Sequence, residues 1–380
     1  MSGARRVVIT GLGSVSAAGC GGSAAVAAAL ERSAETIAPL KAFVVPDCAS
    51  RLAAEVDDDE LMTLLDADTV RRLSRICRMA VAACRLAATD AGIAGGARLG
   101  LSVGSEYGDF RSGAEFFSGF LRRGPGGLSP MIFPNTVMNS MAAVVAITMG
   151  AKAPSITVNQ ATVAGDLAVV QGAALIASGR ADAVIAGGVD EIFFDVYRGL
   201  CALGALSPMR DGAREGCRPY APDHNGLVMG EGATFLVLEE REAARARGAR
   251  IVAEIPEAAW GNVPTAPHTG GARRADVDSP VSRLLRARGP EGFERCYGAG
   301  NGDPAVDDWE HALLTRDLAA ARPSLVPPVS LAPLFGQHGG LGALRVGAAA
   351  LDAERGAASV LVHGIARGGC RTALVVGPPR

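Results

Sequence analysis

The sequence predicts a large α/β fold, and three observations support this class. Short apolar runs of strand length alternate with helical patterns along the 380 residues. The helical pattern from about Thr162 to Ser178 has no charged side chain between Asp166 and Arg180, so it is apolar all round and must be buried. Ala, Gly and Val are abundant while aromatic residues make up only 4% of the chain, which favours closely packed helices and strands.

The stretch from Ser155 to Asp190 is the centre of the predicted core. Its β-branched run Ile156–Val158 predicts a strand that ends in a turn at Asn159–Gln160. The buried helix follows, and a second strand, Ala183–Ala186, is expected to stop at Gly187–Gly188. We expect the helix to present its N-terminal amides to a central cavity.

Composition and charge argue against several classes of protein. The formal net charge of −2, without a long charge run, argues against nucleic acid or an anionic membrane as a partner. The eight Cys contain no Cys-x-x-Cys pair, so a disulfide scaffold or zinc site is not expected and the thiols should be reduced and mostly buried. We expect no metal and no cofactor. No apolar run reaches the ~18 residues of a membrane span, and we expect a cytoplasmic protein without a signal peptide.

The elements before the centre follow from their patterns. Arg6–Thr10 predicts a first strand, and Gly11–Ser14 predicts a tight turn into a helix near Ser23–Arg32. The third Gly of a dinucleotide-binding fingerprint is missing there. Residues 35–60 predict a loop. Thr69–Asp90 predicts one long helix whose apolar face includes Cys77 and Cys84, and a strand follows at 99–103.

The next predicted helix, Gly108–Leu121, has two interpretations. Phe110, Gly113 and Phe117 share one face at positions i, i+3 and i+7. They form either an ordinary core stripe or, because Gly113 leaves a gap between two Phe side chains, the end of a cavity. After a loop at 124–127, residues 133–149 predict another apolar helix.

Strands and helices continue to alternate after the centre. Up to residue 280, the predicted elements are paired strands at 227–238 broken at 230–232, a surface helix at 239–247, a strand at 251–259 and a mobile connection at 260–280. A Gly-rich loop at 298–303 and a helix near 307–321 are expected next. The last predicted elements are a polar loop at 337–343, a helix of small residues after it, and strands at 359–362 and 372–376.

Five blocks, taken together and in this order, resemble the β-ketoacyl synthase family. They are Val7–Gly13 (VVITGLG), Phe133–Asn139 (FPNTVMN), the Ser155–Asp190 stretch, Arg218–Tyr220 (RPY) and Val228–Ala233 (VMGEGA). The resemblance implies the thiolase fold: two similar βαβαβαββ halves in a five-layer α-β-α-β-α core that dimerises through its central region. We expect the halves to span residues 1–240 and 241–380.

The resemblance also implies a chemistry that can be checked residue by residue. In the family, a Cys thiolate at the start of the buried helix takes the acyl chain as a thioester, and two His hold the malonyl thioester carbonyl and stabilise the enolate. Here Thr162 stands at the nucleophile position and Ala299 at the first His. A Thr at a helix start usually acts as an N-cap, which is the role we expect of Thr162.

The remaining positions also depart from the family pattern. The second His corresponds to His338 or, because Gly342–Ala343 falls one residue late, to Gly339. Pro333 stands roughly where the family has a supporting Lys. The family's Gly-Phe-Gly-Gly gate loop reads Ala366 followed by Arg367, Gly368 and Gly369. The scaffold of the family is retained while its catalytic groups are replaced.

This pattern resembles the chain-length factors of type II polyketide synthases. Such chains lack the Cys, form a heterodimer with an active ketosynthase subunit, and shape the end of the tunnel for the chain delivered by an acyl carrier protein. They usually have Gln at the nucleophile position, whereas here Gln160 lies two residues earlier. Phe110, Gly113 and Phe117 match the tunnel-closing positions approximately. The compact length and short 260–290 region resemble partners from highly reducing, polyene-type systems.

Two other functions stay open at this point. One is an acyl-transferring enzyme that uses Thr162 with His338, although a Thr hydroxyl is a poor nucleophile without a well-placed base. The other is a homodimeric pseudoenzyme that binds an acyl carrier protein.

Overall fold

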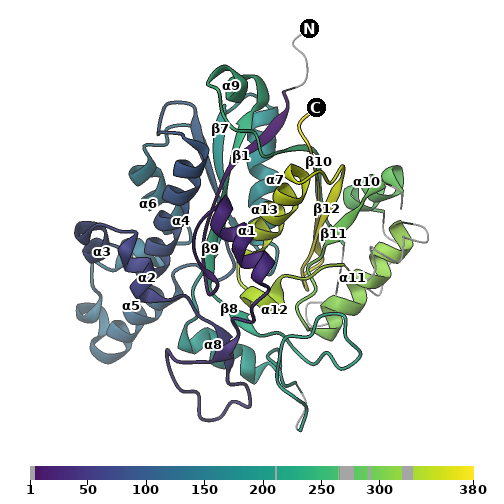
Figure 1. Ribbon diagram of the computed structural model, residues 1–380. Coiled ribbons are helices and arrows are strands. Elements are labelled where there is room, and N and C mark those ends of the chain that lie inside the picture. Colours follow the sequence, from purple (N-terminus) through teal and green to yellow (C-terminus); the bar gives the residue numbers. More distant parts are fainter. Residues whose placement is uncertain (1–4, 210–211, 264, 266–277, 290–291, 319–327) are drawn as a thin grey trace.

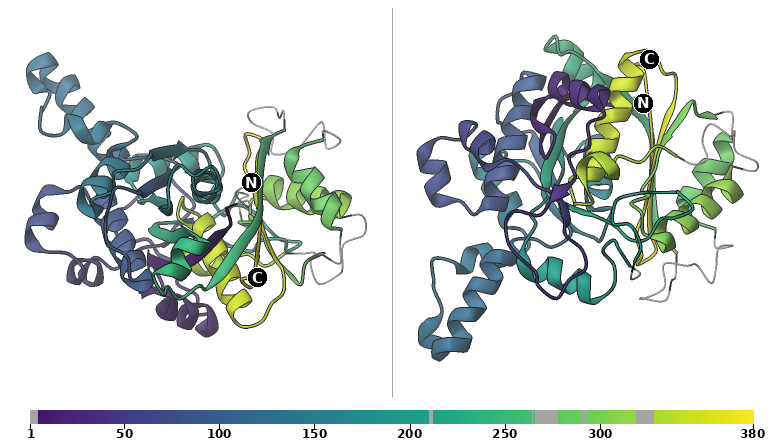
Figure 2. Two further views of the ribbon diagram at one scale, coloured as in Figure 1. Left: turned by 90° about the horizontal axis from the view of Figure 1, so that it is seen from above. Right: turned by 60° about the horizontal axis from the view of Figure 1, so that its bottom comes forward.

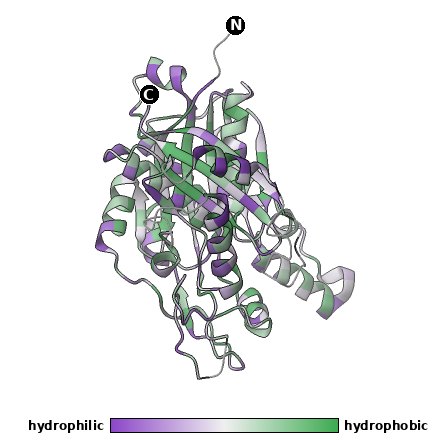
Figure 3. Cartoon of the chain, turned by 90° about the vertical axis from the view of Figure 1, so that its right-hand side faces the viewer, coloured by the Kyte–Doolittle hydropathy of each residue, from purple (hydrophilic) through white to green (hydrophobic). Residues whose placement is uncertain are grey.

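The chain folds into five layers in which three layers of helices alternate with two halves of a β-sheet (Figure 1). The computed structural model describes residues 5–209, 212–263, 265, 278–289, 292–318 and 328–380. Apolar residues are concentrated in the strands and central helices (Figure 3). None of the helices in these ranges is long and apolar enough to cross a membrane. The α/β class and the five-layer arrangement predicted from the sequence are confirmed.

Ten strands of the described chain form one sheet with two halves. The N-terminal half runs, in spatial order, through β1 (Val7–Ser16), β9 (Gly232–Glu240), β7 (Ala183–Asp190), β5 (Leu99–Ser105) and β6 (Ser155–Asn159), and β2 (Gly19–Gly22) pairs with β1. The C-terminal half runs through β10 (Ala253–Asn262), β13 (Cys370–Gly377), β12 (Val360–Ile365) and β11 (Arg295–Tyr297). Pairing of Val7–Ile9 with Ala253–Ile255 joins the halves. A small separate sheet contains β3 (Ala38–Pro39), β4 (Leu52–Ala54) and β8 (Met229–Gly230).

The helices cover both faces of each half-sheet. The central layer contains α7 (Ala164–Ala177), α13 (Leu341–Glu354) and α1 (Ser23–Arg32). One outer layer contains α2 (Asp58–Thr63), α3 (Ala67–Arg72), α4 (Arg75–Ala91) and α6 (Ser140–Met149), and the other contains α10 (Pro280–Arg288) and α11 (Pro304–Asp317). The remaining helices are α5 (Phe110–Arg123), η1 (Gly124–Gly127), η2 (Phe133–Thr136), α8 (Phe194–Ala202), α9 (Arg241–Ala246) and α12 (Ala332–Phe335). The expected domain boundary at 240/241 falls between β9 and α9 and stays a prediction.

The central layer is held together by close packing and by one buried ion pair. Nη2 of Arg345 on α13 donates to both carboxylate oxygens of Asp166 on α7, at 2.9 and 2.7 Å. Both residues are almost fully buried. Gly342 lets the helices approach, because a Cβ there would collide with the Asp166 carboxylate. The helix that the sequence predicted to be apolar all round is thus buried, with its one carboxylate paired.

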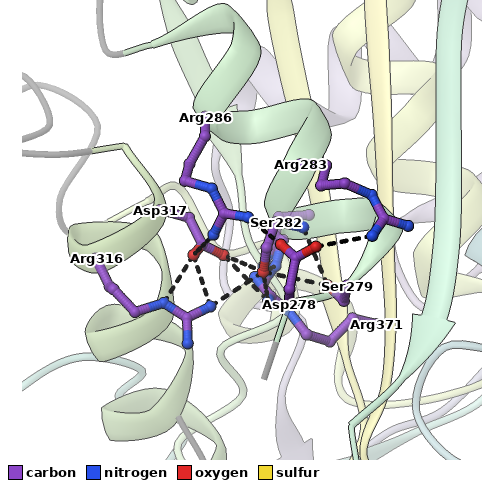
Figure 4. Close-up of polar contacts among 9 residues, drawn as sticks. Asp278, Ser279, Ser282, Arg283, Arg286, Arg316, Asp317 and Arg371 are labelled. Atoms are coloured by element: carbon purple, nitrogen blue, oxygen red, sulfur yellow. Dashed lines mark hydrogen bonds and ion pairs between the residues drawn. The ribbon is translucent and has the colours of Figure 1, made fainter. Parts of the chain in front are cut away.

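A second buried polar cluster fastens the outer helices α10 and α11 to β13 (Figure 4). Asp317 at the end of α11 accepts hydrogen bonds from Ser282 of α10 at 2.7 Å and from Arg371 of β13 at 3.1 Å. Arg316 also donates to Asp317, at 2.7 Å. Because Asp317 and Arg371 are fully buried, each compensates the charge of the other.

Helix α5 projects away from the layered core, together with η1 and η2 (Figure 2). The side chains of Phe110 and Phe117 are 47% and 62% exposed, and a Cβ on Gly113 would meet no atom within 4 Å. The core-stripe interpretation of this face is therefore wrong for the single chain, since its apolar side chains contact solvent.

Two predicted strand ends were wrong because the glycines there pack against backbone instead of turning. Strand β1 does not end at Thr10 but runs on through Gly11 and Gly13, which lie directly against the backbone of α4 where any Cβ would collide. Likewise β7 runs through Gly187–Gly188 to Asp190. These glycines permit close approach of neighbouring backbone rather than a change of direction.

Two further boundaries differ from expectation. The helix predicted at 69–90 is divided into α3 and α4, because Leu73 takes an extended conformation between them. The strands predicted to pair at 227–238 belong to different sheets, with β8 beside β4 and β9 beside β1 and β7. Most of the connection predicted to be mobile at 260–280 lies outside the described residues.

One pair of cysteines contradicts the expectation of reduced thiols. Cys48, in the loop before β4, and Cys201, on α8, form a disulfide with Cα atoms 5.9 Å apart. The two residues are 153 positions apart, so their spacing gave no sign of the pairing. The fold brings them together in an apolar cluster with Val45 and Tyr197. Cys77 and Cys84 are free and buried on α4, as expected.

Candidate functional site

A cavity lies where three parallel strands end. β5, β6 and β7 are mutually parallel, and their last residues are Ser105, Asn159 and Asp190. Ligands of α/β folds commonly bind outside the carboxyl ends of such strands. The cavity has a volume of about 440 Å³. Its lining residues are Glu106, Tyr107, Ala161, Thr162, Leu200, Leu203, Ala205, Leu227, Met229, Asn301, Asp303, Val306, Gln337 and Arg367.

Thr162 lies in this cavity in an unusual backbone conformation. Its φ is +63°, which is uncommon for a β-branched residue and indicates local strain. The N-cap of α7 is Val163, without a side-chain capping bond, so the expectation that Thr162 caps the helix is wrong. The amide of Thr162 instead donates to Glu106 Oε2 at 3.1 Å. The chain therefore presents the Thr162 side chain on a fixed, strained turn just before the buried helix.

The carboxylates of Asp190 and Glu106 hold the backbone around this turn and the end of β5. Asp190 accepts hydrogen bonds from the Ser105 hydroxyl at 2.6 Å and from the amides of Tyr107 and Gly339 at 3.1 and 2.8 Å. Burial raises the pKa of Asp190 to about 6, against the opposing effect of these donors. Burial, with the nearby Asp190 charge adding to it, raises the pKa of Glu106 to about 7. Glu106 is thus a lining group of the cavity that changes its charge near neutral pH.

The Gly-rich loop at 298–303 is held from behind by α11. Glu310 Oε1 accepts the amide of Ala299 at 2.9 Å, and Glu310 Oε2 accepts that of Gly300 at 2.9 Å. Ala299 itself is buried in an apolar cluster and does not line the cavity. Asn301, two residues later, does line it. The position expected for the first His therefore contributes no polar group to the site.

Behind this loop, His363 connects Glu310 to the buried cluster of Figure 4. His363 Nδ1 lies 2.6 Å from Glu310 Oε1, and its Nε2 lies 3.0 Å from Arg371 Nη2. Since Arg371 can only donate, Nε2 accepts and Nδ1–H donates to Glu310. Burial lowers the pKa of His363, although the Glu310 charge opposes this effect. His363 is thus a neutral structural link, fully buried and away from the cavity.

The loop at 337–340 places no imidazole in the cavity. Gln337 is the residue of this loop that lines it, and its Oε1 accepts from Asn301 Nδ2 at 3.3 Å. His338 is buried and does not line the cavity; its Nδ1 accepts the amide of Gly340 at 3.1 Å, and burial lowers its pKa to about 4. A Cβ on Gly339 would collide with Asp190. Within the described residues no hydrogen bond joins His338 to Thr162, so the expected dyad is not assembled.

One of the three gate-loop residues is among the described residues that line the cavity. Arg367 lines it and forms an ion pair with Asp303, with Nε 2.6 Å and Nη2 2.5 Å from Asp303 Oδ2. Gly369 is in the left-handed region at φ +87° and closes the turn through its amide to Ala366 O at 2.9 Å. Gly368 faces the loop that carries Gln160.

The sequence pointed to Thr162 and Arg367 but not to the other polar lining residues, Glu106, Tyr107, Asn301, Asp303 and Gln337. One signal was present: Glu106 immediately follows a buried strand, and polar residues at the ends of neighbouring parallel strands converge. The predicted tunnel residues Phe110, Gly113 and Phe117 are not among those that line the cavity. They lie on the projecting helix, and their role in a tunnel stays a prediction.

The sequence matches the family model for the N-terminal domain of β-ketoacyl synthases over residues 4–244. It is 32% identical over 256 residues to a 3-oxoacyl-[acyl-carrier-protein] synthase 2 of Synechocystis sp., in a match covering 66% of this chain and 61% of that protein. It is 31% identical to the granaticin polyketide putative beta-ketoacyl synthase 1 of Streptomyces violaceoruber over 92% of this chain and 86% of that one. The chain thus aligns with less than two thirds of the length of the first of these relatives.

Two solved structures share the complete fold. The ishigamide ketosynthase/chain length factor has a TM-score of 0.87 and 26% sequence identity, covering 99% of this chain and 100% of that chain. A beta-ketoacyl synthase from Burkholderia phymatum has a TM-score of 0.85 and 24% identity over the same shares, a likeness that concerns the fold alone.

Proposed function

The chain belongs to the β-ketoacyl synthase family, and we propose that within it this protein is a non-catalytic chain-length-factor-like subunit of a type II polyketide synthase. It pairs with an active ketosynthase and shapes the tunnel for the growing polyketide. It also meets the acyl carrier protein to which that polyketide is attached. The relative of known structure with the highest TM-score quoted above bears the name of a ketosynthase/chain length factor, which supports this assignment.

The observation that carries the proposal is the chemistry of the cavity lining. Neither a thiol nor an imidazole is among the described residues that line it. Thr162, Asn301 and Gln337 are neutral at all ordinary pH values, and within the described residues no hydrogen bond joins the Thr162 hydroxyl to a base; Glu106 accepts its backbone amide instead. Loss of one oxyanion-type donor typically lowers a rate by ~10²–10³. A chain that lacks the nucleophile and both imidazoles in this cavity is therefore not expected to condense acyl units alone.

The exposed apolar residues around α5 and α6 support the proposal that this protein binds a partner chain. Of the fourteen large hydrophobic residues that are exposed in the described chain, nine lie between residues 110 and 147. We call these nine residues the 110–147 apolar surface: Phe110, Phe117, Phe120, Leu121, Met131, Phe133, Val137, Met138 and Ile147. Exposed apolar side chains concentrated in one part of the chain in this way are typical of an interaction site. The edge strand β6 ends the sheet nearby, and the free hydrogen-bonding groups of an edge strand favour pairing with another chain.

Co-expression with the ketosynthase encoded nearest to this chain tests the pairing. We expect the two chains to co-purify as a 1:1 complex that is resolved by sizing and mass. A stable homodimer of this chain that ignores the ketosynthase supports the pseudoenzyme instead and contradicts the proposal.

Acylation of the isolated chain tests the enzymatic alternative. The full chain is incubated with an acyl carrier thioester and digested, and the peptide containing Thr162 is weighed by mass spectrometry. We expect no acyl adduct, and the same result for Thr162→Val, because the nearby Glu106 carboxylate binds the amide of Thr162 and not its hydroxyl. An adduct present in the wild type and absent in Thr162→Val identifies an acyltransferase.

A further inference from the structure

We propose that Cys48 and Cys201 are a redox-active pair, which holds α8 and the 40–51 segment together while it is oxidised and frees this segment when a dithiol reduces it. The disulfide reaches the wall of the cavity, because Leu200 and Leu203, before and after Cys201, both line the cavity. The 40–51 segment, all of which the structure describes, contains no helix or strand and lies beside α8 at the lower end of Figure 1. The inference goes beyond the proposed function and does not depend on it, since it concerns the chemistry of one chain.

The other cysteines of the chain are poorly suited to thiol chemistry. Burial raises the pKa of all six free thiols, which are Cys20, Cys77, Cys84, Cys217, Cys296 and Cys370. A thiol with a raised pKa contains little thiolate, and the thiolate is the form that attacks a disulfide. An external thiol is therefore needed to open the disulfide between Cys48 and Cys201.

The two sulfurs of the disulfide differ in their access to solvent and in their charged neighbours. Cys201 is half-buried and is followed by exposed residues at 202–204, whereas Cys48 is only 2% exposed. An external thiolate is thus expected to attack the sulfur of Cys201. Cys48 then leaves as a thiolate from a turn that also holds the guanidinium of Arg51, which donates to the carbonyl oxygens of Cys48 and, at 2.9 Å, of Ser50. A neighbouring Arg lowers the pKa of a thiol and so favours its departure.

The reductant is a dithiol, and the exchange transfers two electrons and two protons. Its first thiolate forms a mixed disulfide with Cys201 and displaces the Cys48 thiolate, which takes up a proton. Its second thiol then attacks the reductant's own sulfur in the mixed disulfide and releases Cys201 as a thiol. The reductant ends as a disulfide, and an oxidised partner of the same class drives the reverse reaction.

Contacts around the disulfide keep the two cysteines close to one another when it is open. The ring of Phe43 packs edge-to-face against Phe194 and Tyr197 of α8, with ring centroids 5.7 and 5.9 Å apart. The hydroxyl of Ser50 donates to the carbonyl oxygen of Ser207 at 2.6 Å. These contacts are weaker than a covalent bond, so the segment can open locally after reduction and the disulfide can form again.

Thiol counting on the full chain tests the redox chemistry. The folded chain is equilibrated with oxidised glutathione or with excess dithiothreitol, freed of the reagent in acid, denatured, and alkylated with iodoacetamide for mass spectrometry. We expect six alkylated cysteines from the oxidised chain, eight from the reduced chain, and six again after reoxidation. Eight alkylated cysteines after oxidation, or a different pair, overturn the proposal. A disulfide that stays closed in the folded chain under excess dithiothreitol also overturns it and identifies a purely structural crosslink.

Proteolysis tests whether the pair holds the segment in place. The chain has two Lys, of which Lys41 lies in the 40–51 segment and Lys152 lies in the connection between α6 and β6, and both are exposed. An endoproteinase that cleaves after Lys therefore has an internal control. We expect reduction, followed by removal of the reagent without air, to speed cleavage after Lys41 by about tenfold or more and cleavage after Lys152 by less than about twofold, because only the segment gains freedom to open.

Two matched variants separate the pair from the other thiols. Cys201→Ser under oxidising conditions should be cleaved after Lys41 as fast as the reduced wild type. Cys20→Ser removes a free thiol that is also half-buried, and it should behave as the oxidised wild type. Equal cleavage after Lys41 in the two redox states of the wild type contradicts the proposal whether or not the variants fold. Equal acceleration at Lys41 and Lys152 contradicts it as well, since reduction then loosens the whole chain.

Discussion

At the scale of single residues, Glu106 couples the strained turn at Thr162 to the end of β5. Its carboxylate accepts the Thr162 amide at 3.1 Å, and burial with the Asp190 charge raises its pKa to about 7. In the unfolded chain the same carboxyl loses its proton near pH 4–5. Between these values the folded state holds a proton that the unfolded state has released. The contribution of Glu106 to stability is therefore full at low pH and is lost as the pH rises through about 7.

Glu106→Gln is accordingly expected to become more stable, relative to the wild type, as the pH rises from about 5 to about 8. Gln keeps an oxygen for the Thr162 amide but has no charge to bury, and the relative gain should reach about 2–3 kcal/mol. Urea unfolding of both proteins at several pH values measures the difference. A difference that stays constant with pH shows that Glu106 titrates as an ordinary surface carboxyl.

Gly113 gives a second prediction at this scale. A side chain at this position meets no atom within 4 Å in the single chain, so Gly113→Trp should fold normally and be as stable as the wild type or slightly more so. If the 110–117 face closes the tunnel of a complex with a ketosynthase, the variant complex should release shorter products. Gly113→Ala is the control and should leave product length unchanged. Unchanged products from Gly113→Trp would count against the assignment of this face.

The sequence predicted which residues lie near the cavity where their place along the chain was sufficient to locate them. It did not predict which side chains line the cavity, because that depends on the direction in which each side chain points. The order of sequence blocks was sufficient to place Thr162 before the buried helix. Alignment could not show that Ala299 and His338 turn away from the cavity while Asn301 and Gln337 turn toward it. Neighbouring residues of a Gly-rich loop differ in direction according to local backbone angles, and sequence spacing does not determine these angles.

At the scale of elements, one buried ion pair adds to the close packing between α7 and α13. Asp166→Asn removes a charge that Arg345 needs in a fully buried site, and we expect a loss of about 3–5 kcal/mol of unfolding free energy. Asp182→Asn is the matched control, because Asp182 pairs with Arg5 and Arg98 at the surface, where such pairs contribute about 1 kcal/mol or less. Denaturant unfolding of both variants measures the contrast. Similar losses for the two would show that burial does not govern the pair.

The sequence predicted the order of the elements well and their ends less well. Periodicity located α1, α6, α7 and α13, because a buried helix has a long apolar pattern. It did not show that Gly11 and Gly188 lie within strands, because the reason for these glycines is the backbone of a segment that packs against the sheet. The disulfide between Cys48 and Cys201 could not be predicted from the sequence either, because it depends on contacts between segments 153 residues apart.

At the scale of the whole molecule, the 110–147 apolar surface is a feature that the layered core leaves uncovered. Leu121 and Ile147 are each 83% exposed on it, whereas Val44, at 79%, is exposed elsewhere. Leu121→Glu and Ile147→Glu should abolish co-purification with the ketosynthase without lowering the melting temperature, because neither side chain packs in the core. Val44→Glu should leave the complex intact. Equal effects from all three would place the interface elsewhere.

The edge strand β6 has a consequence for how a cell must supply this protein. A chain that ends its sheet in an open strand beside exposed Phe, Leu and Met side chains is a substrate for chaperones, proteases and aggregation until that edge is covered. We therefore expect surplus copies to be degraded rather than stored. We expect the steady-state amount of this chain to follow the amount of its partner, so that dosage is set by balanced synthesis of two polypeptides and not by the strength of one promoter.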